Sequence, residues 1–300
     1  MKKISHIIFV AATFILAACN KQDLASLHNT QSQSHQKSEA LAYPIPDHIV
    51  VLILENHAYN QIIGSPQAPY INSLAKDTSS ANFTNSYGIE HPSQPNYLDL
   101  YSGSNQGVHN DNHPRNEPFA TANLGRQLID KNKTYLTYSE DLPSVGFNGN
   151  TSGKYARKHN PATNWMGTDT NQMPSTTNQP YTAFPTDYTQ LPTACFVVPN
   201  LNNDMHEGSI SKGDTWVQNN MDAYIQWTKT HNSLFILTFD EDDSRHANHI
   251  TTIFTGEHVK AGGYLNKINH YNILRTIEDA YQLPYAGNAA TATPITYCWK

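Results

Sequence analysis

The sequence predicts an α/β fold: a three-layer α/β/α domain built on a mostly parallel, doubly wound sheet. An unbroken apolar run at residues 49–54 and a mostly apolar run at 233–239 are typical of strands that are buried on both faces, as in parallel sheets. Stretches with the helical spacing of apolar residues alternate with these runs along the chain. Such alternation of strands and helices is typical of a doubly wound sheet.

The first half of the chain contributes strands and helices in turn. Residues 49–54 form the first strand, which ends abruptly in polar residues. Residues 68–77 predict a short helix, and helical spacing of apolar residues predicts another that begins at Ser93. A helix at 121–131 then leads into a strand at 133–141.

The second half begins with residues 142–192, which are rich in Asn, Thr, Pro and Tyr and show no periodicity. A segment of this kind and length is typical of a functional lid or insertion. A strand at 193–200 follows, and then an amphipathic helix at 213–230 that we expect Asp214 to cap. The core face of this helix would carry Trp216, Met221, Tyr224 and Trp227, and the remaining elements are strands at 233–239 and 249–256 and a helix at 269–283.

The composition favours an exported protein and argues against nucleic-acid binding. Only 15% of the 300 residues are charged, the net charge is −6, and Asn, Gln, Ser, Thr and Tyr are abundant. Affinity for nucleic acid depends on clustered Lys and Arg, which this composition does not supply. A phosphate group would therefore have to be bound by a local site.

The N-terminal residues predict export. Lysines precede an apolar run at residues 7–18, which is too short to span a bilayer and is typical of a signal peptide. The run closes on LAAC at residues 16–19, which resembles the lipobox of bacterial lipoproteins. The resemblance implies a lipoprotein signal peptide at 1–18 and an acylated Cys19 that anchors the mature protein to the outer membrane, on its periplasmic side or at the cell surface. An ordinary cleaved signal peptide is the alternative.

The rest of the chain divides into a tether and one domain. Residues 19–42 are polar, lack aromatic side chains and predict a flexible tether, so that a single domain spans residues 43–300. Cys195 and Cys298 remain beyond the lipobox cysteine. An even pair in an exported protein is consistent with a disulfide, and two separate buried thiols are the alternative.

Polar clusters follow the predicted strands at three places. Glu55 and Asn56 end the first strand, Asp204 and His206 follow the strand at 193–200, and residues 240–243 are all acidic. In open α/β sheets, ligands bind beyond the carboxyl ends of the strands. Oxygen ligands from separate strands suit a hard divalent cation, so the sequence predicts a metal site at this edge.

Ser93 lies at the predicted start of a helix and allows two interpretations. It is a simple capping serine, or it is a nucleophile next to the predicted cation. The free N–H groups and the dipole of a helix N-terminus favour negative charge, and a nearby cation lowers the pKa of a hydroxyl. The same N–H groups suit a phosphoryl group during in-line attack.

Six motifs together resemble the bacterial phosphoesterase family of secreted acid phosphatases and phospholipases C, and within it the shorter acid phosphatase and phosphatidylinositol-3-phosphatase branch. They are HIVVLILENHAYNQIIG, HPSQPNYLDLYSG, YARKHNP, VPNLNNDMHEGSISKGDTWV, TFDEDD and NHYNILRTIEDAYQLP, in this order between about residues 47 and 285. The resemblance implies an alkaline-phosphatase-like fold. In that superfamily a Ser or Thr followed by x-Pro-Asn is the nucleophile, a pattern that Ser93 and Asn96 match.

The resemblance also implies metal ligands and their number. Glu55 and Asn56 match the first pair of ligands, and Asp240 and Glu241 match the second pair, which is Asp-Asp in the larger acid phosphatases. The nucleophile Ser93 would also contact the metal. Two-metal members of the superfamily carry an aspartate where this chain has a neutral asparagine at position 200. A single divalent ion is therefore favoured, with its identity open.

Further residues are expected around the phosphate. Lys158 and His159 supply cationic groups in a chain that is poor in them, and we expect both, together with Asn96, to bind phosphate. We expect Asp204 and His206 at the catalytic site, where an imidazolium at position 206 would protonate the leaving group.

These observations predict an exported, metal-dependent acid phosphatase that hydrolyses phosphate monoesters through a phosphoserine at Ser93. The substrate would be a small phosphate ester or the headgroup of a phospholipid, including phosphoinositides. A phospholipase C-type phosphodiesterase is one alternative. A catalytically inactive lipoprotein that only binds a ligand is the other.

Overall fold

A computed structural model describes residues 44–300 of the chain, and these residues form one compact unit. The predicted signal peptide, lipobox and tether lie outside the described residues. Among residues 44–300, no helix combines the length and the apolar character needed to cross a membrane.

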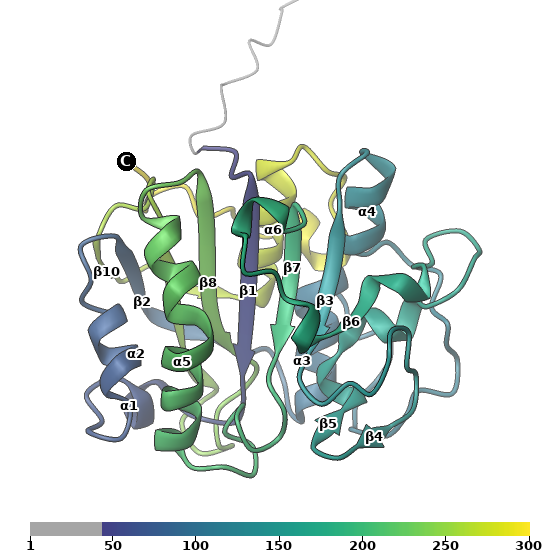
Figure 1. The fold of residues 1–300 in the computed structure, drawn as a ribbon, viewed down its shortest axis with the longest axis horizontal. Helices are drawn as coiled ribbons and strands as arrows, with labels where there is room; N and C mark the ends of the chain where they lie inside the picture. The colour runs from purple at the N-terminus through teal and green to yellow at the C-terminus, as the bar shows by residue number, and fades with distance from the viewer. Residues whose placement is uncertain (1–43) are drawn as a thin grey trace, which may run out of the picture. The chain divides into compact units, whose positions relative to one another are not determined.

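The centre of the fold is a nine-stranded sheet with the strand order β10-β2-β9-β8-β1-β7-β3-β6, to which β11 adds by pairing with β2 (Figure 1). β1 (His48–Leu54) runs parallel to both of its neighbours, β7 (Ala194–Val198) and β8 (Ser233–Phe239). The carboxyl ends of these three strands therefore meet at one edge, the lower one in Figure 1. Ligands gather at this edge in open α/β sheets.

The sheet is mixed at one side. β9 (His249–Thr255) runs antiparallel to both β8 and β2 (Ser80–Tyr87), whereas all other pairs in the sheet are parallel. β2 is absent from the expected elements because its sequence, SANFTNSY, is mostly polar. The other strands are β3 (Tyr135–Ser139), β6 (Asn178–Pro180), β10 (Gly262–Tyr264) and β11 (Ile268–Asn269), and β4 (Thr151–Ser152) pairs with β5 (Tyr155–Ala156) in a separate hairpin.

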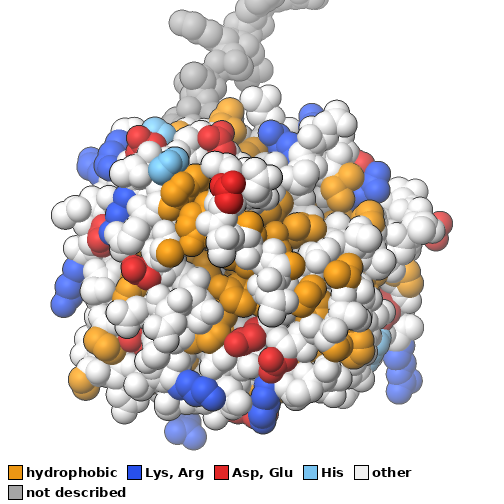
Figure 2. Space-filling view, in the orientation of Figure 1, with side chains coloured by type: hydrophobic (Ala, Val, Ile, Leu, Met, Phe, Trp, Pro, Cys, Tyr) orange, Lys and Arg blue, Asp and Glu red, His pale blue; other side chains and the backbone are white. Residues whose placement is uncertain are grey.

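Two apolar cores lie on opposite faces of the sheet, which confirms the predicted three-layer architecture. Alternate side chains of β1 enter different cores: Val50 and Leu52 face one, Ile49 and Val51 the other. One core is covered by α1 (Tyr59–Ile62), α2 (Pro69–Leu74) and α5 (Ile210–Thr228), and the other by α3 (Ser93–Ser102), α4 (Leu124–Asp130) and α6 (His270–Ala280). On the face that α5 covers, charged side chains are scattered among uncharged ones (Figure 2).

The expected cap of α5 is wrong. The helix begins at Ile210, and the side chain of Ser209 caps it by accepting a hydrogen bond from Lys212 N. Asp214 lies one turn inside the helix and is buried. Its two carboxylate oxygens accept hydrogen bonds from the backbone N–H groups of Tyr70 (3.0 Å) and Ile71 (2.8 Å), so it caps α2 across the core instead.

The disulfide between Cys195 and Cys298 is also wrong. Both are buried free thiols. Cys195 lies on β7 and faces the core under α5, whereas Cys298 belongs to the core on the opposite face. The sheet therefore separates the two sulfurs, and the alternative of two buried thiols holds.

The long segment 142–192 is made of short pieces. It contains the β4–β5 hairpin at the lower edge of the sheet and the edge strand β6 (Figure 1). Its 3₁₀ helix η1 (Arg157–His159) lies against α3 and carries two of the predicted site residues. The other 3₁₀ helices are η2 (Pro161–Trp165), η3 (Ser175–Thr177), η4 (Tyr181–Ala183), η5 (Tyr188–Gln190) and, near the C-terminus, η6 (Gly287–Ala290).

Candidate active site

Ser93 is buried at the first position of α3, and its side chain does not cap the helix. Instead, Ser93 Oγ lies 3.0 Å from Glu55 Oε2 and 2.9 Å from Glu241 Oε1. A hydroxyl has one proton and can donate to only one of these oxygens at a time. The hydroxyl thus lies between two carboxyl groups. A cation bound here would offset the repulsion between these closely spaced oxygens.

The register of β1 and β8 explains why these acids meet. Leu54 is paired with Phe239, so the next residues, Glu55 and Asp240, leave the sheet side by side at its carboxyl edge. The backbone N–H of Asp240 donates to Leu54 O at 3.0 Å and extends the ladder by one residue. The acidic end of each strand is therefore placed by strand pairing.

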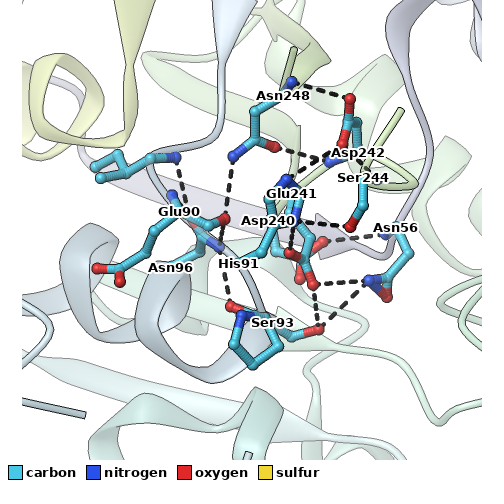
Figure 3. Close-up of polar contacts among 12 residues, drawn as sticks. Asn56, Glu90, His91, Ser93, Asn96, Asp240, Glu241, Asp242, Ser244 and Asn248 are labelled. Carbon is cyan, nitrogen blue, oxygen red and sulfur yellow. Dashed lines mark hydrogen bonds and ion pairs between the residues drawn. The ribbon is translucent and has the colours of Figure 1, made fainter. Parts of the chain in front are cut away.

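Asn56 turns back toward the nucleophile. Its backbone is in the left-handed region, with φ of 52°, a conformation that asparagine tolerates better than most residues. Asn56 Nδ2 lies 2.9 Å from Glu241 Oε1 and 3.5 Å from Ser93 Oγ, while its backbone N–H donates to Asp240 Oδ1 at 3.1 Å (Figure 3). Glu55, Asn56, Ser93, Asp240 and Glu241, which the sequence predicts as metal ligands, thus lie together.

The five grouped residues include three acids and no cationic side chain. Burial and then the charge of Asp204 raise the pKa of Glu55, and burial followed by Glu55 and Glu241 raises the pKa of Asp240. Asn56 Oδ1 and Asp240 Oδ2 are buried without a hydrogen-bond partner among the described residues. Buried carboxylates and buried oxygens without a hydrogen-bond partner are the ligands that a divalent cation requires. The residues therefore fit a metal.

A second group of candidate ligands shares Glu55. His159 is buried, with Nδ1 3.1 Å from Asp204 Oδ2 and Nε2 3.3 Å from Glu55 Oε1. Glu55, His159 and His206 present ligand atoms within 4.8 Å of one another. Burial and then Lys158 lower the pKa of His159, which keeps the imidazole neutral, the form that binds metals. His159 was expected beside the phosphate, and its contacts are instead with acids.

Asp204 and His206 join the site through the backbone. Glu55 N donates to Asp204 O at 2.8 Å, and Asp204 Oδ1 accepts from His206 N at 2.8 Å. Burial raises the pKa of the Asp204 carboxyl. Partial burial, His159 and Lys158 lower the pKa of His206 to about 4. His206 therefore carries a proton only under strongly acidic conditions in this arrangement.

Lys158 faces a small cavity beside α3. Its Nζ lies 2.7 Å from Asp111 Oδ2 and 3.3 Å from His206 Nε2. Burial lowers the pKa of Lys158, but Asp111, Glu55 and Asp240 raise it above its ordinary value, so the ammonium stays charged. The cavity has a volume of about 250 Å³ and is lined by Gln94, Asp111, Asn112, His113, Asn150, Thr151, Ala156, Arg157, Lys158 and Leu201.

Asn96 does not face this cavity. Its Oδ1 accepts from the backbone of Ile89 (2.9 Å) and Glu90 (3.1 Å), and its Nδ2 donates to Glu90 O (2.7 Å) and Pro92 O (3.2 Å) (Figure 3). These bonds use the hydrogen-bonding capacity of the amide. The structure thus shows Asn96 holding the loop that leads into the nucleophile, rather than pointing at a phosphate.

Three residues of the site are absent from the sequence predictions. Tyr97 donates to Glu55 Oε1, and its ring stacks on His159 with 5.2 Å between centroids. His91 Nδ1 contacts Glu241 Oε2 (Figure 3), and Asp111 binds Lys158. No local sequence pattern gives any of the three a role at the site.

Comparison with known proteins identifies the family. The model of the Phosphoesterase family matches residues 65–284. The chain belongs to the Phosphoesterase family. The predicted resemblance and the assignment of the chain as a phosphoric ester hydrolase are thereby confirmed.

Named relatives of this phosphoesterase are phosphatases. The phosphatidylinositol-3-phosphatase of Mycobacterium tuberculosis is 44% identical over 260 residues, which cover 87% of this chain and 85% of the relative. The acid phosphatase of Aspergillus fumigatus is 30% identical, and the phosphate-repressible acid phosphatase of Penicillium chrysogenum is 29% identical; each match covers 68% of this chain. The chain spans about half the length of these two fungal relatives, at 49% and 52%.

Solved structures support the predicted fold. A protein of the alkaline phosphatase superfamily from Vibrio parahaemolyticus matches with a TM-score of 0.57 at 11% identity, over 85% of this chain and 72% of that one. The C-terminal periplasmic domain of EcEptC from Escherichia coli, solved in complex with Zn, matches with a TM-score of 0.55 at 11% identity, over 86% and 89% of the two chains. At this identity the similarity concerns the fold, and the predicted fold class is confirmed.

Proposed function

We propose that this phosphoesterase is a metal-dependent acid phosphatase that hydrolyses phosphate monoesters through a phosphoserine at Ser93. The observation that carries the proposal is the position of the Ser93 hydroxyl, buried within 3.0 Å of carboxyl oxygens that come from two neighbouring strands. A buried hydroxyl between acids has no evident structural use, since it caps no helix. It is the arrangement expected of an activated nucleophile.

The metal would be held by Glu55, Asn56, Asp240 and Glu241 around Ser93. Support comes from Asn56 Oδ1 and Asp240 Oδ2, which are buried without a hydrogen-bond partner among the described residues, and from the raised pKa values of Glu55 and Asp240. When bound, a divalent ion would supply a positive charge that lowers the pKa of the serine hydroxyl. We keep the proposal of one ion at this position, and metal analysis of the purified protein would also reveal a second ion near His159 and His206.

The residues around the cation would divide the remaining work. Lys158 and the backbone N–H of Gln94 at the start of α3 would hold the phosphoryl oxygens. Ser93 Oγ gives its proton to the adjacent carboxylate of Glu55 or Glu241 as it attacks phosphorus. The bond from phosphorus to the ester oxygen breaks, and the departing oxygen takes a proton, for which His206 is the proposed donor at acidic pH. Water then attacks the phosphoserine, the Ser93 Oγ–P bond breaks, and the serine regains its proton as inorganic phosphate leaves.

The cavity beside Lys158 indicates a polar leaving group. Side chains from Gln94, Asn112, Asn150 and Thr151 offer hydrogen-bond donors and acceptors, and the volume of about 250 Å³ suits a small ring better than acyl chains. The M. tuberculosis relative is named for a phosphoinositide. We therefore include the headgroup of phosphoinositides among the substrates, with any acyl chains outside the cavity.

A direct test is the substitution Ser93→Ala. We expect hydrolysis of p-nitrophenyl phosphate to be abolished while the circular dichroism spectrum is retained. Ser102→Ala is a matched control, because Ser102 is a buried serine at the other end of the same helix and bonds only to nearby residues of its own segment. Full activity of the Ser93→Ala protein would refute Ser93 as the nucleophile. Hydrolysis of diesters but not of monoesters by the wild-type protein would favour a phospholipase C-type activity.

We also propose export as a lipoprotein anchored through Cys19. Support comes from the lipobox-like residues 16–19 and the polar stretch after them. Wild-type protein should partition into the detergent phase, and Cys19→Ala should move it to the aqueous phase. An unchanged partition would exclude acylation of this cysteine.

A further inference from the structure

Two groups that we propose to bind phosphate share one internal partner. Asp111 Oδ1 accepts a hydrogen bond from Gln94 N at 3.0 Å, in the first turn of α3 and next to Ser93. Asp111 Oδ2 lies 2.7 Å from Lys158 Nζ. A single carboxylate thus spans the helix N–H and the ammonium.

The backbone on both sides of Asp111 is held by hydrogen bonds from the Gln94 side chain. The side chain of Gln94 is buried, and its Nε2 donates to Asn110 O at 2.9 Å and to Asn112 O at 2.8 Å. The residues that flank Asp111 are therefore fixed by the residue that follows the nucleophile. The Asp111 side chain itself is 32% exposed and lines the cavity, so it can leave without opening the core.

A carboxylate with this geometry satisfies the same donors that a phosphoryl group needs. Backbone N–H groups at a helix start and a lysine ammonium are common ligands of phosphate oxygens. A phosphate monoester carries more charge than a carboxylate and offers three acceptor oxygens. It can therefore replace Asp111 at both donors, but only after breaking two charge-assisted hydrogen bonds.

We propose that Asp111 is an internal anion that occupies the phosphate position of the free enzyme and competes with substrate and product. This inference rests on the proposed function, because it needs Lys158 and the start of α3 to be the phosphate site. Its consequence is that Asp111 weakens the binding of phosphate. The opposite role, in which Asp111 positions Lys158 for the substrate, would make its loss harmful to binding.

The test is the affinity of the full-length protein for inorganic phosphate, measured by isothermal titration calorimetry with divalent metal present. We expect Asp111→Asn to lower the Kd for phosphate about tenfold, the scale of one charge-assisted hydrogen bond. The KM for p-nitrophenyl phosphate should fall in parallel. If Asp111→Asn does not fold, Asp111→Ser removes the same charge with a smaller side chain.

Glu207→Gln is the matched control for the general effect of removing an acid. Glu207 pairs with Lys154 and lies next to His206, but it contacts neither Gln94 nor Lys158 directly. Asp111→Asn must strengthen phosphate binding more than Glu207→Gln does. If the wild type is active and Asp111→Asn binds phosphate no more tightly than the wild type does, the inference is overturned and the proposed function stands. A wild type that neither binds phosphate nor hydrolyses p-nitrophenyl phosphate overturns the proposed function and the inference together.

Discussion

Ser93 Oγ lies 3.0 Å from Glu55 Oε2, although 38 residues separate the two along the chain. The contact joins the start of α3 to the end of β1, two backbone elements that are each fixed by their own packing. Because both side chains are buried, the hydroxyl and the acid have no solvent to separate them. The groups that we propose to react are therefore in place before a substrate arrives.

The contact between Ser93 and Glu241 predicts a large catalytic effect. Glu241→Gln removes the charge 2.9 Å from Ser93 Oγ and keeps the shape. We expect kcat/KM for p-nitrophenyl phosphate to fall by about 10²–10³-fold, comparable to the loss of a preorganised electrostatic contact. Asp243→Asn, which removes an acid of the same loop that bonds to Gln61 and His246, should retain activity. Equal activities of the two variants would contradict the role of Glu241.

Lys158 should act mainly on substrate binding. Lys158→Met removes the ammonium but keeps an unbranched side chain, and we expect kcat/KM to fall by about 10–100-fold, as for the loss of one or two charge-assisted hydrogen bonds. Lys154→Met is a suitable comparison, because Lys154 is more exposed and pairs with Glu207. Steady-state kinetics would show a raised KM only in the first variant. A change confined to kcat would place Lys158 with the leaving group instead.

Metal removal should lower both activity and stability. A chelator should abolish hydrolysis and lower the Tm, because the buried carboxyls Glu55, Asp240 and Glu241 would lose their counter-charge, and re-added divalent ions should reverse both changes. In the chelated state we expect Asp240→Asn to have a higher Tm than the wild type, since burial and neighbouring acids penalise the charge at this position. Differential scanning fluorimetry would measure both effects. An unchanged wild-type Tm across chelation and metal addition would argue against the site.

Glu278, a buried residue of α6, should make stability depend on pH. Burial raises its pKa from 4.5 to about 8, and Oε1 accepts from Ala286 N at 2.8 Å. Between these pH values the folded protein keeps a proton that the unfolded chain has lost, so the free energy of unfolding decreases as the pH rises from about 4.5 to 8. This contribution is fully present below pH 4.5 and is lost above the folded-state pKa.

Glu278→Gln lacks this titration. Thermal denaturation should give similar Tm values for the variant and the wild type at pH 4.5, and a higher Tm for the variant at pH 8. Each 1 kcal/mol corresponds to about 2–4 °C in a domain of this size. Glu257→Gln, at a glutamate whose side chain is 43% exposed, is the control variant for the loss of a carboxylate. A constant Tm difference across this pH range would refute the raised pKa.

The strand ends were predictable because the apolar pattern of a buried strand is a local property of the sequence. Apolar runs identify β1 and β8, and their parallel pairing brings Glu55 and Asp240 together. The helix start at Ser93 follows from the spacing of apolar residues, whereas the set of five predicted metal ligands came from the family resemblance. The mostly polar β2 carries no such run, so its place in the sheet was not predictable from its own residues.

Long-range contacts decided the rest. Asp214 has the composition of a cap for its own helix, yet it caps α2 because the packing of two helices brings Tyr70 and Ile71 within its reach. Cys195 and Cys298 look like a pair, but the direction in which each side chain leaves the backbone puts them on opposite faces of the sheet. Side-chain direction at a strand depends on register, which one cysteine alone does not reveal.

The sequence by itself determined the fold class, the family and the carboxyl edge at which the candidate site lies, since these depend on periodicity and on contiguous motifs. Only the tertiary structure placed Tyr97 on Glu55, His159 between two acids and Asp111 on Lys158. Those contacts join loops to strand ends, and their geometry is set by side-chain hydrogen bonds between residues far apart in the chain. No short-range pattern specifies such bonds, because each depends on where the rest of the fold positions its partner.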